Sequence, residues 1–349
     1  MSCCTYGLTI FNSGSGPERF TRAQKLAQAA EAAGFETVWT SELYNRSATI
    51  VMASLAQATE RCEVGSSIAY GVGRSPLMWA AEARDLDDLS AGRLVLGLGN
   101  GTKRMMEDWH GVSGDAPAVR MEELVDLLRK LWRLDQGPVH HDGRFYRVHV
   151  TPTSDTAPPY RLHLPIYTAG VNDRIMQSAG RVADGLIGHP MFTKHYVDEV
   201  VRPALAAGAA TSGRDPEELR LTGILMCAID ADVDAARRQI AYAIAQYAAS
   251  RVYDRLFALH GWSDAQSAIR EAVRRRDTDA TIAAVPEDAI DAIAVACSPG
   301  ELAAQVARHG ADYDHLNLTG PPWGLEPAAQ EAGAHQIVLE MRSALAPAV

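Results

Sequence analysis

The chain has 349 residues, of which 47% are hydrophobic and 22% are charged. These proportions are ordinary for a globular enzyme with a sizeable core, and the length suits one large α/β barrel or two medium domains. A net charge of −10 argues against a nucleic acid as the main partner, because that function needs a basic face.

The start of the chain and the cysteines bear on the cellular compartment. The first residues, MSCCTYGLTIF, lack the basic segment and long apolar run of a secretory signal, and no stretch reaches the roughly 20 apolar residues of a membrane span. We therefore expect a reduced, cytoplasmic protein with no membrane partner. The cysteines show neither a metal-type C-x-x-C spacing nor an even disulfide framework; they are Cys3, Cys4, Cys62, Cys227 and Cys297.

Strand-like runs alternate with helical patterns along almost the whole chain. The first helical pattern ends at Gly34, a helix terminator, and another begins at Pro76, since proline is favoured in the first helical turn. The predicted strands, in chain order, are Thr5–Ile10, Glu36–Thr40, Cys62–Tyr70, Arg93–Gly99, Pro165–Gly170, Asp184–His189, Leu219–Ile229 and Asp314–Gly320.

Eight strands, each followed by a helix, favour a (β/α)8 TIM barrel over a doubly wound sheet. Such a barrel takes about 250 residues, so we expect one barrel domain over 1–349 with insertions near 102–118, 137–164 and 245–293. The second insertion contains a predicted hairpin that turns at Asp142-Gly143. The neighbouring His140 and His141 lack further ligands at metal spacing, so we expect no metal site.

The run RLVLGLGNG has glycines at alternate positions, Gly97, Gly99 and Gly101. A dinucleotide fingerprint is excluded, because Thr102 stands where its third glycine is needed and the run follows the fourth strand. The spacing before Lys103 also excludes a P-loop. In a barrel this loop lies on the face where active sites assemble, and glycines there let a flat ring or a phosphate approach the backbone. A tight strand exit with no ligand is the alternative explanation.

Three stretches resemble the bacterial-luciferase-like monooxygenase superfamily: LSAGRLVLGLGNG, AAEAAGFETVWTSELYN and PIYTAGVNDRIMQSAGRVADGLIGHP. Within it the sequence is most similar to the branch that uses the deazaflavin coenzyme F420, which includes the methylene-tetrahydromethanopterin reductases. This resemblance implies a cofactor site at the carboxyl ends of the strands, with FMN as the alternative cofactor.

The resemblance also places that cofactor along the chain. It implies a non-prolyl cis peptide at Ser67–Ile68 that backs the cofactor ring, and backbone N–H groups after the fifth strand that bind its phosphate. Arg74, Lys103, Arg104 and Arg174 are the candidate cations for an acidic cofactor tail. The implied cofactor-binding residues are Thr40, Ser67, Ile68, Gly99, Asn100, Gly101, Ala169, Gly170, Val171, Asn172, Gly188 and His189.

Glu42 and Tyr44 are the candidate catalytic residues. Glu42 follows the second strand, where a carboxyl group in an apolar barrel mouth can exchange a proton near neutral pH; a purely structural carboxylate is the alternative. Leu43 stands where many family members have histidine, which makes a sugar phosphate an unlikely substrate. Trp109 and His110 are the candidate substrate-pocket residues.

The resemblance, together with these residues, implies an F420-dependent oxidoreductase that transfers a hydride between the deazaflavin C5 and a small organic substrate. A two-component FMN monooxygenase that uses reduced flavin, oxygen and a partner reductase is the alternative. A barrel that binds the cofactor without turnover is a further alternative. The resemblance also implies a homodimer, paired through helices near the second and third strands.

Overall fold

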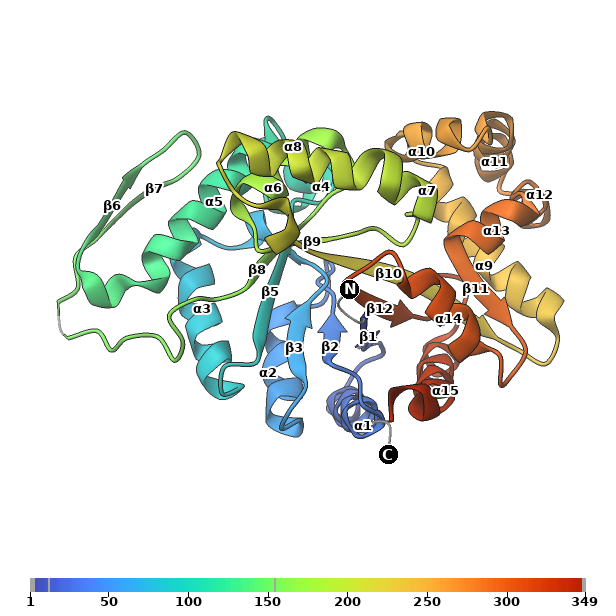
Figure 1. The fold of residues 1–349 in the computed structure, drawn as a ribbon, viewed down its shortest axis with the longest axis horizontal. Coiled ribbons are helices and arrows are strands. Elements are labelled where there is room, and N and C mark those ends of the chain that lie inside the picture. The colour runs from blue at the N-terminus through green and yellow to red at the C-terminus, as the bar shows by residue number, and fades with distance from the viewer. Residues whose placement is uncertain (1–3, 12, 154, 347–349) are drawn as a thin grey trace.

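The computed structural model describes residues 4–11, 13–153 and 155–346. Eight parallel strands of this part close into a barrel, in the order β12–β1–β2–β3–β5–β8–β9–β10 and back to β12. The predicted (β/α)8 TIM barrel is confirmed, and each predicted strand overlaps a barrel strand (Figure 1). The barrel strands are β1 (Thr5–Thr9), β2 (Thr37–Thr40), β3 (Glu63–Ser66), β5 (Leu94–Gly99), β8 (Ile166–Ala169), β9 (Gly185–Ile187), β10 (Arg220–Ile229) and β12 (His315–Thr319).

Helices surround this barrel and begin and end where local sequence signals require. The first helix ends at Gly34, whose φ of 99° is left-handed, and α3 begins at Pro76 after the Ser75 cap. The surrounding helices are α1 (Glu18–Ala33), α2 (Ala48–Ala58), α3 (Pro76–Leu89), α5 (Pro117–Trp132), α6 (Asp173–Val182), α7 (Lys194–Tyr196), α8 (Arg202–Thr211), α9 (Val233–Ala248), α14 (Leu302–Gly310) and α15 (Pro327–Leu345).

Three further segments lie outside the strand–helix units of the barrel. Helix α4 (Lys103–His110) follows β5 directly, and the hairpin of β6 (Val139–Asp142) and β7 (Arg147–Val150) projects from one end of the molecule (Figure 1). At the other end lie α10 (Asp254–Leu259), α11 (Ser263–Arg275), α12 (Thr278–Ala283) and α13 (Glu287–Ile293).

Two short strands differ from the sequence-based prediction. β11 (Ala294–Cys297), which was not predicted, pairs with the outer half of β10, outside the barrel. β4 (Ala69–Tyr70) lies within the predicted strand Cys62–Tyr70 but is separate from β3 and pairs with the end of β5. The run containing β11 is apolar on both sides of a helix end, so its periodicity does not separate a strand from a continued helix.

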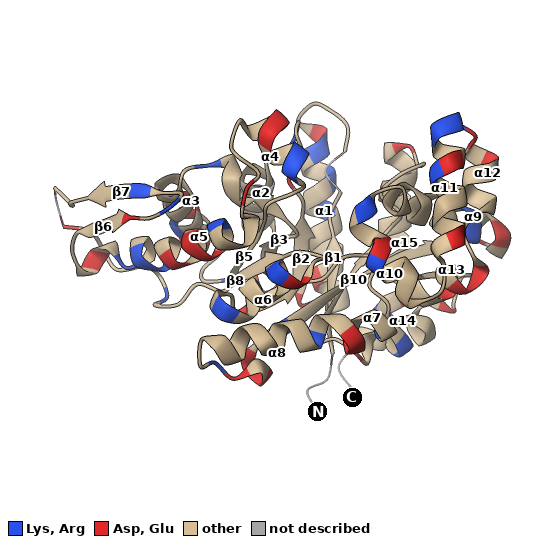
Figure 2. Ribbon diagram, turned by 90° about the horizontal axis from the view of Figure 1, so that it is seen from above, with Lys and Arg blue, Asp and Glu red and all other residues tan. Residues whose placement is uncertain are grey.

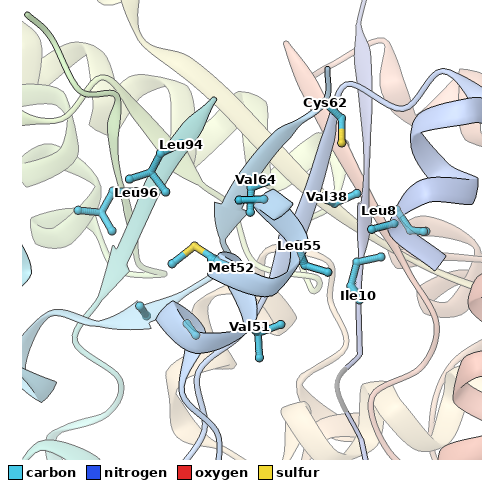
Figure 3. Packing of buried hydrophobic residues seen from close by; sticks show 14 of the residues in the cluster. Leu8, Ile10, Val38, Val51, Met52, Leu55, Cys62, Val64, Leu94 and Leu96 are labelled. Atoms are coloured by element: carbon cyan, nitrogen blue, oxygen red, sulfur yellow. The ribbon is translucent and has the colours of Figure 1, made fainter. Parts of the chain in front are cut away.

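Two layers of apolar side chains hold the barrel together. Outside the strands, Leu8 of β1, Val38 of β2 and Val64 of β3 pack in one cluster with Met52 and Leu55 of α2 (Figure 3). Inside the barrel a separate cluster consists of Trp39, Val95, Tyr167 and Ile187. The interior is therefore packed, as in other barrels, and leaves the strand ends to bind ligands.

The amino end of the barrel is closed by a polar network around His315, which is 1% exposed. The Trp39 indole N–H donates to His315 Nε2 at 3.0 Å, so Nδ1 carries the hydrogen and donates to Glu36 Oε2 at 3.0 Å. Glu36 also accepts a hydrogen bond from Thr5 at 2.6 Å and pairs with Arg220. These contacts lower the pKa of Glu36 to about 2 despite its desolvation. His315 is the first residue of β12, so this network lies at the end of the barrel opposite the carboxyl ends of the strands.

No helix among the described residues is long and apolar enough to cross a membrane, and these residues contain no group of three metal-ligating side chains that could hold an ion. Cys62, Cys227 and Cys297 are buried thiols, and burial raises the pKa of Cys62 to about 12. Cys3 lies outside the described residues. Figure 2 shows that acidic and basic residues alternate along the outer helices.

Candidate active site

The carboxyl ends of the barrel strands carry the candidate residues, on the face where barrel enzymes place their active sites. Helix α4 and helix α10 lie on either side of the strands at this face (Figure 2). The candidate site has three parts: the β3–β4 bulge, the start of α6, and the aromatic groups near α4 and α10.

The bulge between β3 and β4 contains the cis peptide bond expected at Ser67–Ile68. The Ser67 N–H donates to the Thr40 carbonyl at 2.8 Å, and the Ile68 carbonyl accepts the Glu42 N–H at 2.9 Å. Thr40 is buried beside the bulge, and its carbonyl group is one of the two backbone contacts that fix the bulge. The Ser67 hydroxyl is buried and has no hydrogen-bond partner among the described residues. Buried hydroxyl groups are normally hydrogen-bonded, so the Ser67 hydroxyl is an exception in this part of the structure.

The glycines of β5 make room for that bulge. A Cβ on Gly97 would collide with the Ser66 carbonyl, and a Cβ on Gly99 would lie 2.9 Å from Ile68 Cδ1. Neither residue has a positive φ, so close packing explains both glycines. The sequence pattern allowed either a cofactor ring or a tight strand exit beside these glycines. In the structure, Ser66 and Ile68 of the protein occupy the space beside them. Contact between Gly99 and a cofactor remains a prediction.

The loop after β5 is fixed by its own contacts. The Asn100 side chain is buried and donates to the Pro117 carbonyl at 2.9 Å, while Gly101 has a left-handed φ of 69°. Thr102 then caps α4 by accepting the Met105 N–H. Asn100 and Gly101 therefore hold the loop between β5 and α5 in one conformation.

Glu42 is the centre of a fully partnered cluster. Its Oε1 lies 2.9 Å from an Arg74 nitrogen, and its Oε2 accepts the Tyr70 N–H at 2.9 Å. Arg74 also pairs with Glu82 at 2.8 Å and lies over the Trp79 ring. Both carboxylate oxygens thus hold the segment after the bulge, which is the structural role that the sequence left open.

Aromatic side chains beside Glu42 form one wall of the mouth, which we term the α4 wall: Tyr44, Tyr70, Trp109 and His110. Trp109 is 43% exposed and meets the rings of Tyr44 and Tyr70 edge to face, at 5.4 and 6.1 Å. His110 lies 5.1 Å from the Tyr70 ring, and its buried Nε2 has no partner among the described residues. The structure therefore brings the candidate catalytic and substrate-pocket residues together. Leu43 and Tyr44 are exposed beside them, with Tyr44 76% exposed.

A cavity of about 590 Å³ lies at the amino end of α6. Asn172 caps this helix by accepting the Ile175 N–H, so the first turn directs further backbone N–H groups outward. Such a helix end attracts a phosphate through its N–H groups and its dipole. The cavity is lined by Val171, Asn172, Arg174, Arg255 and the Ala116–Val119 segment, among others. Ala169 and Gly170 lead directly into it from β8.

The four candidate cations for an acidic tail differ in their partners. Arg74 pairs with two carboxylates, Lys103 with Glu107 and Asp115, and Arg104 with Asp108. Arg174 lines the α6 cavity and has no ion pair among the described residues. Arg255, which the sequence reading did not select, lines the same cavity and pairs with Asp173.

A second group of aromatic residues surrounds His189, after β9, and we term it the α10 wall: His189, Tyr247, Tyr253 and Trp323. His189 Nε2 lies 2.8 Å from the Tyr253 hydroxyl, and Tyr247 packs against both His189 and Trp323, with ring centroids 4.6 and 4.4 Å away. Burial lowers the pKa of His189 to about 3. Its neighbour Gly188 donates its N–H to Thr222.

His189 was predicted from the sequence as a site residue, whereas the three aromatic residues around it were not. Tyr247 and Tyr253 flank the start of the third insertion, in the stretch QYAASRVYDRLF, and Trp323 follows β12. The density of aromatic residues in that stretch was the available signal. Without a motif it does not show which part of the barrel mouth these side chains reach.

The sequence model of the luciferase-like monooxygenase family matches residues 5–313 of the chain. An uncharacterized protein of Mycobacterium tuberculosis is 32% identical over 81% of this chain and 84% of its own length. A putative coenzyme F420-dependent oxidoreductase of the same organism is 30% identical over 61% of this chain and 63% of its own. The 5,10-methylenetetrahydromethanopterin reductase of Methanopyrus kandleri is 27% identical over 80% of this chain and 82% of its own.

Solved structures show the same fold. The coenzyme F420-dependent tetrahydromethanopterin reductase of Methanopyrus kandleri superposes with a TM-score of 0.77 at 23% identity, over 97% of this chain and 98% of that one. The oxygenating constituent of 3,6-diketocamphane monooxygenase of Pseudomonas putida, in complex with FMN, superposes with a TM-score of 0.67 at 16% identity, over 98% and 99%. Enzymes named for F420 and for FMN thus share this barrel.

Proposed function

Because the chain belongs to the luciferase-like monooxygenase family, a family of oxidoreductases, we propose that it is an F420-dependent oxidoreductase acting on a small organic substrate. F420 is favoured over FMN by two of the sequence relatives above. One, at 30% identity, is named as a putative F420-dependent oxidoreductase. The other, the Methanopyrus kandleri reductase at 27% identity, is described as F420-dependent in its solved structure. The FMN-bound neighbour is only 16% identical.

The single observation that carries the cofactor assignment is the cavity at the amino end of α6. It combines a capped helix start, an arginine without an ion pair among the described residues, and a volume of about 590 Å³, within the range of small-molecule sites. The unpartnered Ser67 hydroxyl at the bulge supports a ring position next to it. The residues present therefore fit a cofactor with a planar ring and an anionic tail.

In this assignment the bulge at Ser67 and Ile68 lies against the cofactor ring. Val171, Asn172 and Arg174 bind the phosphate and the acidic tail. When bound, F420 supplies two-electron hydride transfer at its C5 carbon, and the protein contributes binding, orientation and electrostatics.

Glu42 acts as a positioning residue, because its two oxygens hold Arg74 and the Tyr70 N–H. The exposed Tyr44 hydroxyl is the group of this wall that can exchange a proton with substrate. Trp109 and His110 exclude water from the α4 side of the mouth.

The first test is a side-by-side titration of the purified protein with F420 and FMN, followed by tryptophan fluorescence. Tight binding of F420 alone supports the proposal. Tight binding of FMN, or of reduced FMN, contradicts it in favour of a two-component monooxygenase with a partner reductase. A protein that binds F420 but supports no turnover with any tested substrate would instead be a binding barrel.

A variant series locates the tail. We expect Arg174→Ala to weaken F420 binding about three- to tenfold, the range of one partly exposed charge-assisted hydrogen bond. Arg275→Ala, which removes an equally charged side chain at the end of α11, is the matched control. Equal affinities of the two variants would place the tail outside the α6 cavity.

We also propose that the protein forms a homodimer through α2 and α3, near β2 and β3. Ile50, Leu77 and Met78 on these helices are 60%, 41% and 50% exposed, which leaves an apolar area for a partner to cover. Sedimentation equilibrium tests this, and Ile50→Glu should shift a dimer toward monomer. A monomeric wild-type protein at micromolar concentration contradicts it.

A further inference from the structure

The hydrogen bonds around His189 fix its tautomer. The Met191 backbone N–H can only donate, and it lies 3.2 Å from His189 Nδ1, so Nδ1 is the acceptor. The neutral ring then carries its hydrogen on Nε2, which donates to the Tyr253 hydroxyl oxygen at 2.8 Å. The low pKa of about 3 keeps the ring neutral at physiological pH. His189 therefore orients Tyr253 by donating to it.

This arrangement leaves the hydrogen of the Tyr253 hydroxyl available. The oxygen already accepts from His189, and among the described residues the hydroxyl has no other hydrogen-bond partner. Burial and the nearby Tyr247 raise the pKa of Tyr253, so the phenol stays protonated and can donate. A buried donor without an acceptor costs free energy, which a ligand oxygen would recover.

The surroundings of this hydroxyl define what such a ligand can be. The α10 wall consists of His189, Tyr247, Tyr253 and Trp323, and none of these side chains carries a charge at neutral pH. Trp323 follows β12 and is 40% exposed. An anionic ligand group would lack a counter-ion on this wall, whereas an uncharged oxygen on an apolar ring would match both features.

We propose that Tyr253, oriented by His189, donates a hydrogen bond to the carbonyl or hydroxyl oxygen of a small uncharged cyclic substrate that packs against Trp323. This inference names the substrate class of the oxidoreductase proposed above and rests on that function. A ketone and the corresponding secondary alcohol both present such an oxygen, on a carbon that can accept or give a hydride. Tyr253 thus binds the substrate, and His189 is a positioning residue.

The test compares two probes of nearly equal shape, cyclohexanone and methylenecyclohexane, which lacks the oxygen. Binding to the protein is measured by saturation-transfer NMR, with oxidised F420 present and again without it. We expect the wild-type protein to prefer the ketone about tenfold, the ratio that one neutral hydrogen bond provides. Tyr253→Phe keeps the ring and should abolish that preference. Tyr160→Phe, at an exposed tyrosine on the connection before β8, is the matched control and should retain it.

A ketone preference that persists in Tyr253→Phe would overturn the inference, as would a wild-type protein that does not discriminate between the probes. The F420 titration separates this result from the proposed function. Failure to bind F420 with an intact, Tyr253-dependent ketone preference contradicts the cofactor assignment alone. Normal F420 binding without that preference contradicts the substrate class alone.

The positioning role of His189 has its own measurement. In ¹⁵N-histidine-labelled protein, we expect His189 to show a protonated Nε2 and an unprotonated Nδ1 from pH 5 to 8, with no titration. Tyr253→Phe removes the Nε2 acceptor and should move that nitrogen resonance, while Tyr160→Phe should not. Protonation of Nδ1 in the wild-type protein would contradict the hydrogen-bond direction on which the inference depends.

Discussion

His315 and His189 occupy opposite ends of the barrel. The group that accepts a hydrogen bond from the ring is itself fully partnered at one end and not at the other. At the amino end, His315 accepts from Trp39 and donates to Glu36, whose carboxylate is in turn paired with Arg220. At the carboxyl end, His189 accepts from a backbone N–H and donates to Tyr253, whose own hydrogen has no acceptor among the described residues.

A similar contrast holds between two pairs of polar side chains at the two ends. Near the amino end, Thr5 and Glu36 have protein partners on every side. Near the carboxyl end, the Ser67 hydroxyl and His110 Nε2 are buried and unpartnered within the described residues. Buried polar groups are normally hydrogen-bonded, and the two open positions at the carboxyl end belong to the ligand site that we propose.

The largest effect is expected at the amino end. His315→Ala leaves the Trp39 N–H without its acceptor and opens a cavity, so we expect unfolding free energy to fall by about 2–4 kcal/mol. Urea unfolding measures this, and the folded fraction should keep its cofactor affinity. A loss below about 1 kcal/mol would contradict the structural role of this network.

The stability contributed by the amino-end network should fall at acidic pH. The pKa of Glu36 is about 2 in the fold and 4.5 when free, so its contribution is complete above about pH 4.5 and is lost as pH falls toward 2. Burial also lowers the pKa of His315, which adds loss of stability below its ordinary value of 6.5. Urea midpoints from pH 7 to 3 should therefore fall, and Glu36→Gln should fall less steeply below pH 4.5. Parallel curves for the two proteins would contradict this assignment.

A smaller effect is expected at the start of α6. Asn172→Ala removes the cap of this helix and should cost about 1 kcal/mol of stability together with a weaker cofactor complex. Asn172→Ser restores a capping oxygen and is the control, with stability near wild type. Thermal unfolding and F420 titration measure the two quantities. A stable Asn172→Ala protein with unchanged affinity would remove α6 from the site.

The smallest change in stability is expected for Ser67→Ala, in contrast to the neighbouring Ser66. Ser67→Ala removes a hydroxyl without a partner in the described structure, so we expect unfolding free energy to change by less than about 0.5 kcal/mol while F420 affinity falls severalfold. The adjacent Ser66 hydroxyl donates to the Gly97 carbonyl at 2.8 Å, so Ser66→Ala should cost about 1–3 kcal/mol. Equal stability losses at both positions would show that the Ser67 hydroxyl has a structural partner.

A bulky residue at Gly170, between β8 and α6, would weaken cofactor binding if this backbone holds the phosphate. A Cβ at that position would collide with Ile175 in the first turn of α6, so the substitution would also displace the helix. Loss of affinity in such a variant would therefore not distinguish phosphate contact from helix movement.

The sequence by itself determined the elements of the barrel and their order. The strands follow from apolar runs, and Gly34 and Pro76 mark helix ends because left-handed φ and a missing N–H are properties of single residues. The β5 glycines and the cis bond at Ser67–Ile68 were located through their similarity to a family.

Only the tertiary structure decided what those residues touch. It shows that the space beside Gly97 and Gly99 is filled by the bulge, and that Glu42 is held by Arg74, 32 positions along the chain. It also joins His189 to Tyr253 across 64 positions. Local patterns report backbone preference and burial, whereas a hydrogen-bond partner far along the chain depends on how the barrel closes and where its insertions fold back.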